Sequence, residues 1–96
     1  MFSQISGFEW DEGNRDKNER KHRVTSKECE EAFFDGQKKI IKDPLHSGKE
    51  QRYILLGKTK VHRRLFIVFT IRKLFVRVIS ARDLNKKEYP LYEKRT

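Results

Sequence analysis

The sequence predicts an α+β fold in which two N-terminal helices pack on a three- to four-stranded antiparallel sheet, followed by a short C-terminal helix. Two observations favour this fold class. Most aliphatic and aromatic residues lie between positions 53 and 81, whereas positions 11–23 hold almost none. In the apolar part, side chains alternate with the period of two that strands impose, and the short connections favour an antiparallel meander. With 96 residues, we expect one domain spanning residues 1–96.

The first part of the chain predicts an extended segment and two helices. Residues 1–10 carry aromatic and aliphatic side chains that we expect to pack onto the domain. A first helix is expected over Glu12–His22, and it is polar on all sides. Thr25 and Glu28 have the spacing of a capping box, which predicts a second helix ending near Asp35–Gly36. The apolar stripe of this second helix consists of Cys29, Ala32 and Phe33.

Four strands are expected in the apolar region. They cover Ile40–Ile41, Gln51–Gly57, Arg64–Thr70 and Leu74–Arg82. Alternation in the second strand places Arg52 and Ile54 on one face and Tyr53 on the other. A last helical segment starts at Asn85, and Pro90 should break or kink it within two turns.

The stretch Leu74–Arg82, which reads LFVRVISAR, is the expected central strand because both of its faces are largely apolar. Arg77 interrupts one of those faces, and a buried arginine is costly unless it is paired. Strict alternation places Arg77 and Arg82 on opposite faces of the sheet. Both side chains can therefore reach one phosphate group only if the strand bends or ends before Arg82.

The charge balance favours an anionic partner. The net charge is +9 with an isoelectric point near 9.9, which suits nucleic acid, an acidic protein or an anionic membrane. A membrane is the weakest of the three, because no apolar run approaches the length of a spanning helix. The N-terminus has no secretory signal, and the single cysteine, Cys29, fits a reducing compartment. We therefore expect a cytoplasmic protein.

Four arginines on or beside three adjacent strands are candidates for phosphate binding. They are Arg52, Arg64, Arg77 and Arg82. Guanidinium groups bind phosphate with two hydrogen bonds and keep their charge, which suits a phosphoryl transition state. The alternative is that each arginine pairs with a carboxylate such as Glu31, Glu50 or Glu88 and serves stability. The sequence leaves both interpretations open.

Proton transfer requires a titratable group, and His22 and Glu50 are the candidates. His22 could instead only complement a helix dipole, and Glu50 could only hold Arg52. Tyr53 could stack on a base of single-stranded RNA, although most aromatic residues of a small domain lie in the core. Asp43 and His46 could contact a metal ion, but two ligands in a turn define no site. We therefore predict no metal site and no cofactor.

The motifs form an ordered series that resembles the BrnT toxins, from about Phe8 to Glu93. The first group is Trp10-Asp11, Asn18, Lys21-His22, Val24, Thr25 and Glu28. The second group is Asp43-Pro44-x-His46-Ser47, Glu50-x-Arg52-Tyr53 and Gly57. The last group is Ile79-Ser80-Ala81-Arg82, Glu88 and Tyr92-Glu93. The chain departs from the family pattern at Asn14, Ser26 and Pro90.

The resemblance implies a type II toxin–antitoxin ribonuclease with a RelE-like fold that cuts RNA without a metal ion. It also implies neutralisation in a heterotetramer with a BrnA-type antitoxin. Such an antitoxin carries a ribbon–helix–helix region, through which the pair contacts operator DNA.

The reaction expected from this resemblance is endonucleolytic RNA cleavage by the substrate's own 2′-hydroxyl group. The expected catalytic residues are His22, Glu50, Arg52, Arg77 and Arg82. The residues expected to bind RNA are Lys21, Tyr53 and Arg64. Two other functions remain open: a non-catalytic basic module that binds nucleic acid, and an interaction subunit whose positive face docks an acidic partner.

Overall fold

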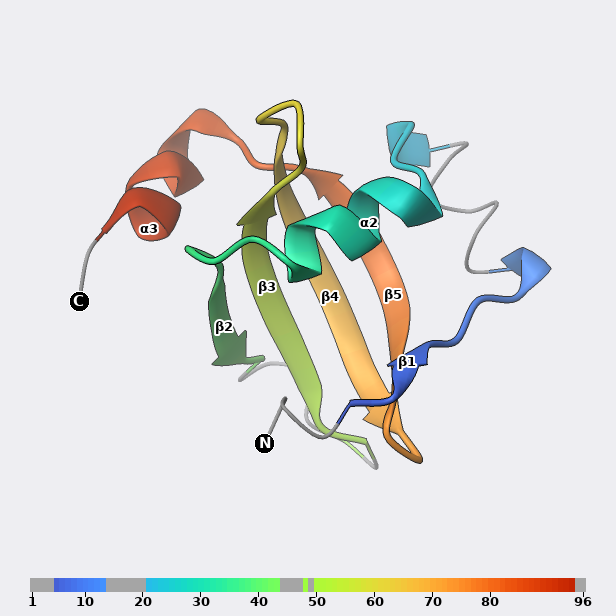
Figure 1. Cartoon of the computed structure of the whole chain (residues 1–96). Coiled ribbons are helices and arrows are strands. Elements are labelled where there is room, and N and C mark those ends of the chain that lie inside the picture. Colours follow the sequence, from blue (N-terminus) through green and yellow to red (C-terminus); the bar gives the residue numbers. More distant parts are fainter. Residues whose placement is uncertain (1–4, 14–20, 44–47, 49, 95–96) are drawn as a thin grey trace.

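The computed structural model describes residues 5–13, 21–43, 48 and 50–94, and its centre is a five-stranded sheet (Figure 1). The strands are β1 (Gly7–Phe8), β2 (Lys39–Lys42), β3 (Arg52–Lys58), β4 (Arg64–Arg72) and β5 (Phe75–Asp83). Their order across the sheet is β1-β5-β4-β3-β2. Helix α2 (Ser26–Phe33) crosses one face of this sheet, and the short helix α3 (Tyr89–Glu93) lies at one end beside β3 (Figure 1).

The predicted fold class is wrong in the sheet. The sheet has five strands and is mixed, because β1 pairs in parallel with β5 while the other neighbours are antiparallel. In the part of the chain described here, α2 is the helix that packs on the sheet from the N-terminal half. The predicted first helix, Glu12–His22, falls largely on residues 14–20, which lie outside the described residues. The predicted RelE-like arrangement on a three- to four-stranded antiparallel sheet is therefore not the arrangement found.

The parallel strand β1 is formed by backbone hydrogen bonds along the edge of β5. The amide of Ser6 donates to the carbonyl of Leu74 at 2.7 Å, and the amide of Glu9 donates to the carbonyl of Val76 at 2.8 Å. These bonds satisfy backbone groups that an edge strand would otherwise leave open. A two-residue strand carries no detectable alternation, so the sequence pattern did not predict it.

Helix α2 confirms the predicted capping box. The hydroxyl of Thr25 accepts a hydrogen bond from the amide of Glu28 at 3.1 Å, and the Glu28 carboxylate accepts one from the amide of Thr25 at 2.9 Å. The predicted apolar stripe is also confirmed. Cys29 and Ala32 are buried, and the ring of Phe33 meets Phe69 edge to face at a centroid distance of 4.8 Å.

The main core lies between α2 and the inner face of the sheet, which is the face that α2 covers. It is built from alternate residues of the three central strands, among them Leu55, Ile67 and Val78. Phe8 and Trp10 pack against this core from the N-terminal segment, as the sequence predicts. The buried thiol of Cys29 belongs to it too, and burial raises its pKa to about 12.

A smaller cluster covers one end of the outer face, which is the face of the sheet away from α2. It joins Leu56 of β3 to Leu84 and to Tyr92 of α3. Asn85 begins the last helical segment as predicted, because its side chain caps a 3-10 turn over Lys86–Glu88. Pro90 lies in the first turn of α3, where a missing amide proton is tolerated, and α3 is only five residues long.

Gly57 permits the close approach of α2 to the sheet. A methyl group added at Gly57 would lie 2.7 Å from the backbone oxygen of Ala32, which cannot move without moving the helix. We expect Gly57→Ala to lower the free energy of unfolding by about 1–3 kcal/mol, as overpacking does. Gly36→Ala is the matched control, because no atom lies within 4 Å of the added carbon. Urea denaturation of both variants measures the difference, and equal midpoints would contradict the prediction.

Candidate active site

A β-bulge in β5 places Arg77 and Arg82 on the same face of the sheet. Arg77 pairs with Thr70 and Val78 with Phe69, but the next residue of β4, Val68, pairs with Ser80. Ile79 is therefore the extra residue that interrupts the alternation. Val76, Val78 and Ala81 all enter the core on the inner face. The bulge thus interrupts the strict alternation that would have placed the two arginines on opposite faces, and both lie on the outer face.

The two arginines nevertheless lie far apart along that face. Arg82 pairs with Phe66 and Arg77 with Thr70, which are four residues apart on β4. At about 3.3 Å per residue, this separates their backbones by about 13 Å. Arg77 lies in one row with Arg52, because Thr70 pairs with both of them. The structure therefore divides the predicted arginines between two ends of the outer face.

Arg82 is held in a fixed orientation. Its two terminal nitrogens donate to the two carboxylate oxygens of Glu88, each at 2.8 Å. Its guanidinium lies 4.0 Å from the ring centroid of Phe66, a favourable cation–π position. These bonds with Glu88 raise the pKa of Arg82. The side chain keeps 34% of its surface exposed, so an anion in solvent can still reach it.

Arg77 and Arg52 lie at the other end of the outer face. Arg77 donates to Glu9 at 3.0 Å and to Asp11 at 2.7 Å, and both carboxylates come from the N-terminal segment. Glu50 accepts two hydrogen bonds from Arg72, at 2.6 and 2.9 Å, rather than holding Arg52. Arg52 makes no ion pair with any carboxylate in the described ranges 5–13, 21–43, 48 and 50–94.

A shallow pocket of about 540 Å³ lies where β5 ends, and it brings three of the predicted site residues together. Lys21, His22 and Arg82 line this pocket, together with Arg23, Asp83 and Asn85. His22 and Lys21 are exposed, so the pocket opens to solvent. We call it the His22 pocket. It combines an imidazole group with ammonium and guanidinium groups, which is a set suited to binding and cleaving a phosphodiester.

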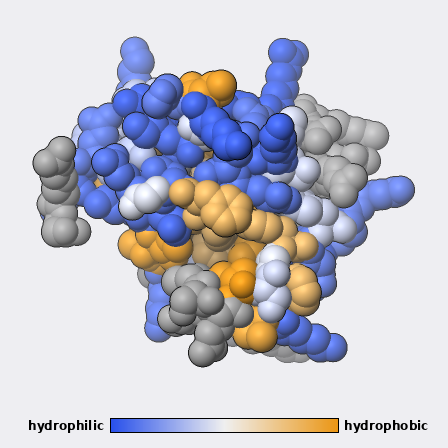
Figure 2. Space-filling model, in the orientation of Figure 1, coloured by the Kyte–Doolittle hydropathy of each residue, from blue (hydrophilic) through white to orange (hydrophobic). Residues whose placement is uncertain are grey.

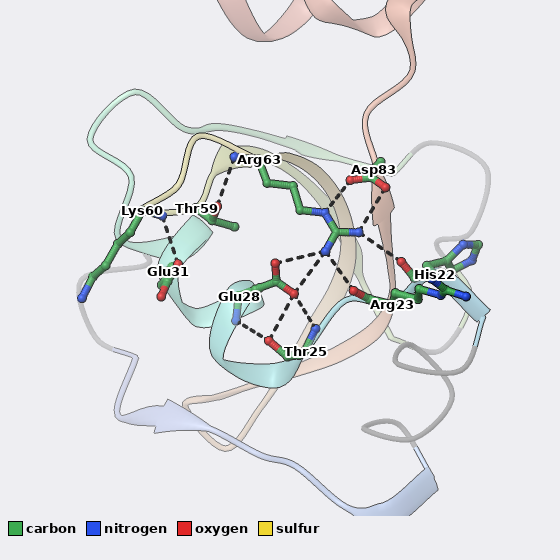
Figure 3. A network of polar contacts seen from close by, with 9 residues as sticks. All are labelled: His22, Arg23, Thr25, Glu28, Glu31, Thr59, Lys60, Arg63 and Asp83. Carbon is green, nitrogen blue, oxygen red and sulfur yellow. Dashed lines mark hydrogen bonds and ion pairs between the residues drawn. The ribbon is translucent and has the colours of Figure 1, made fainter.

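Arg63 builds the frame of the His22 pocket, and no pattern in the sequence singles it out (Figure 3). Its guanidinium donates to Asp83 at 2.6 and 3.1 Å and to Glu28 at 3.0 Å. It also donates to the backbone carbonyls of His22 at 3.1 Å and Arg23 at 2.8 Å. The His22 imidazole points away from this network (Figure 3).

Arg23 adopts a left-handed backbone conformation with φ of 54°, which is uncommon for a residue other than glycine. The bond from Arg63 to its carbonyl holds this conformation in place. In the sequence, Arg63 is only one of several basic residues in the connection before β4. No local pattern indicates that its partners come from three separate segments.

The carboxylates around the pocket are stabilised in their charged forms. Hydrogen bonds from Arg63 lower the pKa of Asp83, and those from Arg82 lower the pKa of Glu88. Partial burial alone would raise the pKa of Glu28, but the bonds from the Thr25 amide and from Arg63 outweigh it and lower that pKa. The pocket is therefore surrounded by ion pairs that persist at neutral pH.

Two predicted RNA-binding residues have other surroundings. Tyr53 is 9% exposed and its ring stacks on Phe69 in the core, with a centroid distance of 5.4 Å. Arg64 donates to Glu93 at 2.9 Å and lies 4.6 Å from the ring centroid of Tyr89. Arg64 thus fastens α3 to the sheet, although a third of its side chain is exposed.

The sequence model of the family described as "Ribonuclease toxin, BrnT, of type II toxin-antitoxin system" matches residues 10–88. The chain belongs to the BrnT family. The matched region includes the His22 pocket and both ends of the outer face, whereas β1 and α3 lie outside it. A BrnT protein is a ribonuclease toxin of a type II toxin–antitoxin system, which implies an RNA substrate and an antitoxin partner. The chain has no match among curated proteins.

Two further findings concern membranes and metals. None of the helices in the described part of the chain is long and apolar enough to cross a membrane. No group of three or more His, Cys, Asp or Glu side chains among the described residues is arranged to hold a metal ion. Asp43 is buried, and its proposed partner His46 lies outside the described residues.

Arg63→Ala should lower the free energy of unfolding by about 1–3 kcal/mol, because it removes charged hydrogen bonds to Glu28 and Asp83 that tie α2 to β5. Arg72→Ala is the control, since it also removes a bidentate arginine–carboxylate pair, with Glu50, but one that is exposed. An exposed pair contributes little, so we expect no measurable loss there. Chemical denaturation measures both variants, and equal losses would refute a special role for Arg63.

The same carboxylates predict a loss of stability in acid. Because the pKa values of Asp83, Glu28 and Glu88 are lowered in the folded protein, the unfolded chain binds more protons as the pH falls. Their contribution is complete above the ordinary carboxylate range near pH 4 and is lost progressively below it. Denaturation midpoints measured from pH 7 down to about pH 3 should fall, and less steeply in Arg63→Ala. Parallel curves for the two proteins would contradict this assignment.

Proposed function

We propose that this BrnT protein is an endoribonuclease that cleaves RNA without a metal ion, through attack of the substrate's 2′-hydroxyl group. The observation that carries the proposal is the His22 pocket, in which Lys21, His22 and Arg82 meet at one place. The pocket contains both a proton-transfer group and cationic groups, so the side chains themselves can supply the functions that the reaction needs.

Cleavage transfers the phosphoryl group from the 5′-oxygen of one nucleotide to the 2′-oxygen of its neighbour. A base removes the proton of the 2′-hydroxyl, the 2′-oxygen attacks the phosphorus, and the bond from phosphorus to the 5′-oxygen breaks. The products are a 2′,3′-cyclic phosphate and a 5′-hydroxyl group, whose oxygen receives a proton. His22 transfers protons, since imidazole groups serve as base or acid near neutral pH. Arg82 and Lys21 stabilise the charge that builds on the phosphoryl oxygens.

Glu88 and Phe66 support this role of Arg82. A guanidinium group loses less entropy on binding a phosphate when its plane is already fixed. The bidentate bonds to Glu88 and the ring of Phe66 fix that plane, while part of the side chain remains exposed. A phosphate approaching from the pocket therefore meets an oriented cation.

Arginines at the two ends of the outer face bind RNA on either side of the cut. Arg52 and Arg77 lie in one row on that face, about 13 Å from Arg82 along the strand direction. We assign them contacts to flanking phosphates, with Arg64 at the opposite end. Glu50 orients Arg72 there instead of transferring protons. The buried Tyr53 has no part in the proposed contacts. Phosphate contacts of this kind make binding weaken as salt increases.

The partner assignments rest on the family. We propose that a BrnA-type antitoxin with a ribbon–helix–helix region neutralises the toxin in a heterotetramer. This antitoxin would carry the contact to operator DNA, and the toxin would act on RNA in the cytoplasm. The net charge of +9 supports a polyanionic substrate.

A non-catalytic RNA-binding module is the second candidate. The observation that favours it is that carboxylates hold Arg77 and Arg82, which would suit cations that bind RNA but take no part in a reaction. In that case, replacing Arg82 would change the affinity for RNA, and neither the wild type nor the variant would cleave it.

Purified protein incubated with RNA in the presence of a chelator tests the proposal. The wild type should produce fragments with cyclic phosphate ends. Arg82→Ala should cleave about 10²–10³-fold more slowly and His22→Ala about 10²–10⁴-fold more slowly. Lys42→Ala on the edge strand β2 is a control that removes an exposed charge away from the pocket and should cleave normally.

Three results would overturn parts of the assignment. Wild-type protein that binds RNA without cutting it would favour the binding module. Cleavage that stops in chelator would refute the metal-independent route. Equal cleavage by the wild type and both pocket variants would move the active site away from His22.

A further inference from the structure

Arg23 lines the His22 pocket, and the reaction proposed above assigns it no part. It shares the lining of that pocket with Lys21 and Arg82. In the view of Figure 1 the segment before α2 lies at the upper right, and Figure 2 shows a hydrophilic surface above α2 in the same view. Arg23 is exposed, so its side chain covers no part of the core. The guanidinium group is therefore accessible to a ligand of the pocket.

The backbone of Arg23 has a conformation that arginine does not favour. Its φ of 54° lies in the left-handed region, where the side-chain Cβ crowds the backbone and where glycine meets no such obstacle. Arg63 holds this conformation by donating to the carbonyl of Arg23 at 2.8 Å and to that of His22 at 3.1 Å. A glycine would follow the same chain path without strain. Strain of this kind is concentrated at functional sites.

No contact of its side chain explains why an arginine occupies this position. Within residues 5–13, 21–43, 48 and 50–94, Arg23 forms no ion pair with a carboxylate. Its side chain points away from the network around Arg63, as the His22 imidazole does (Figure 3). The side chain therefore adds nothing to the fold that would offset the strained backbone.

The carboxylates around the pocket are already bound by other arginines. Asp83, which lines the pocket, accepts hydrogen bonds from Arg63 at 2.6 and 3.1 Å. Glu28 also accepts from Arg63, and Glu88 accepts from Arg82. An anion that enters the pocket therefore meets in Arg23 a guanidinium group that none of these carboxylates holds.

We infer that Arg23 binds a backbone phosphate of the RNA, next to the phosphate that is cut, from the conformation that Arg63 maintains. The inference rests on the proposed function, because it names a further substrate contact of the same pocket. Arg82 is oriented by Glu88 and Phe66, whereas the exposed side chain of Arg23 has no such support. Arg23 therefore holds its phosphate equally well before and during the reaction. A contact of that kind lowers KM and leaves kcat unchanged.

Arg23→Gly tests this inference, because it removes the guanidinium group and suits the left-handed backbone. The probe is a fluorescently labelled single-stranded 2′-O-methyl RNA of mixed sequence, which cannot be cut because its 2′-oxygens are blocked. Fluorescence anisotropy should show about fivefold weaker binding near 0.1 M salt, the upper range for an exposed ion pair. The slope of log affinity against log salt concentration should be smaller by about 0.7, which corresponds to one phosphate contact on a single strand.

Lys73→Gly is the matched control. Lys73 is also an exposed basic residue in the left-handed region, with φ of 49°, and it lies in the turn before β5, whereas the pocket lies where β5 ends. The control therefore removes one positive charge and introduces one glycine at the other end of the strand. We expect its affinity for the same probe to stay within about twofold of the wild type, since the lost charge contacts no phosphate of the pocket.

Cleavage kinetics with unmodified RNA should separate Arg23 from Arg82. Arg23→Gly should raise KM about fivefold, in step with its binding, and should keep kcat within about twofold of the wild type. A kcat that falls while KM is unchanged would overturn the inference, because Arg23 would then act in the reaction itself.

Equal affinities of Arg23→Gly and Lys73→Gly for the probe, or an unchanged salt slope in Arg23→Gly, would also overturn the inference. Circular dichroism verifies folding, and Arg23→Asn, which tolerates the same backbone conformation, replaces Arg23→Gly if the glycine unfolds the protein. Failure of the proposed function is distinct. It shows as absent cleavage of unmodified RNA by the wild type, while binding of the blocked RNA still tests Arg23.

Discussion

The guanidinium group of Arg63 is the contact on which the arrangement of the site depends. It joins Glu28 at the start of α2, Asp83 at the end of β5 and the carbonyls of His22 and Arg23 in the connection before α2 (Figure 3). Asp83 is distant in the sequence from the segment 22–28 and from Arg63, and no shared strand or helix aligns these parts of the chain. Because the guanidinium donors point in fixed directions within one plane, they impose a geometry that a flexible ammonium group could not. The position of the His22 backbone, and with it the pocket, follows from this geometry.

The bulge in β5 is the second constraint. It allows a largely apolar strand to carry two arginines on its outer face. Without an extra residue, one of Arg77 and Arg82 would point into the core under α2, where its charge would be costly to bury. The insertion of Ile79 keeps Val76, Val78 and Ala81 in the core while both arginines face outward. The cost is a locally interrupted ladder, which strands tolerate and which is frequent beside active sites. The bulge thus allows one strand to serve the core and the RNA-binding face together.

Local sequence patterns predicted the elements whose causes are local. The capping box at Thr25, the start of the last helical segment at Asn85, the apolar stripe of α2 and the faces of β3 follow from spacing within a few residues, and the structure confirms them. The parallel pairing of β1 with β5 depends on a backbone contact between chain segments far apart, so no local pattern could reveal it. The carboxylate partners of the arginines also could not be predicted from local patterns. Glu88 is one of the possible partners that the sequence offers. Its bond to Arg82 depends on the turn that brings Asn85 and Glu88 back over β5, and no local pattern predicts that approach.

The ion pairs of the arginines and their proposed binding of phosphate are compatible. A guanidinium group has five N–H donors, and the Glu88 carboxylate and the Asp83 carbonyl accept from three of those of Arg82, which leaves two for a phosphate. Glu88 therefore holds Arg82 in an orientation that a phosphate can use, and it does so without leaving a partly buried charge unpaired when RNA is absent. The same reasoning applies to Arg77 with Glu9 and Asp11. Arg52 shares the outer face with these arginines and forms no ion pair with a carboxylate of the described residues. The outer face thus combines guanidinium groups of fixed orientation with one that no carboxylate holds among the described residues.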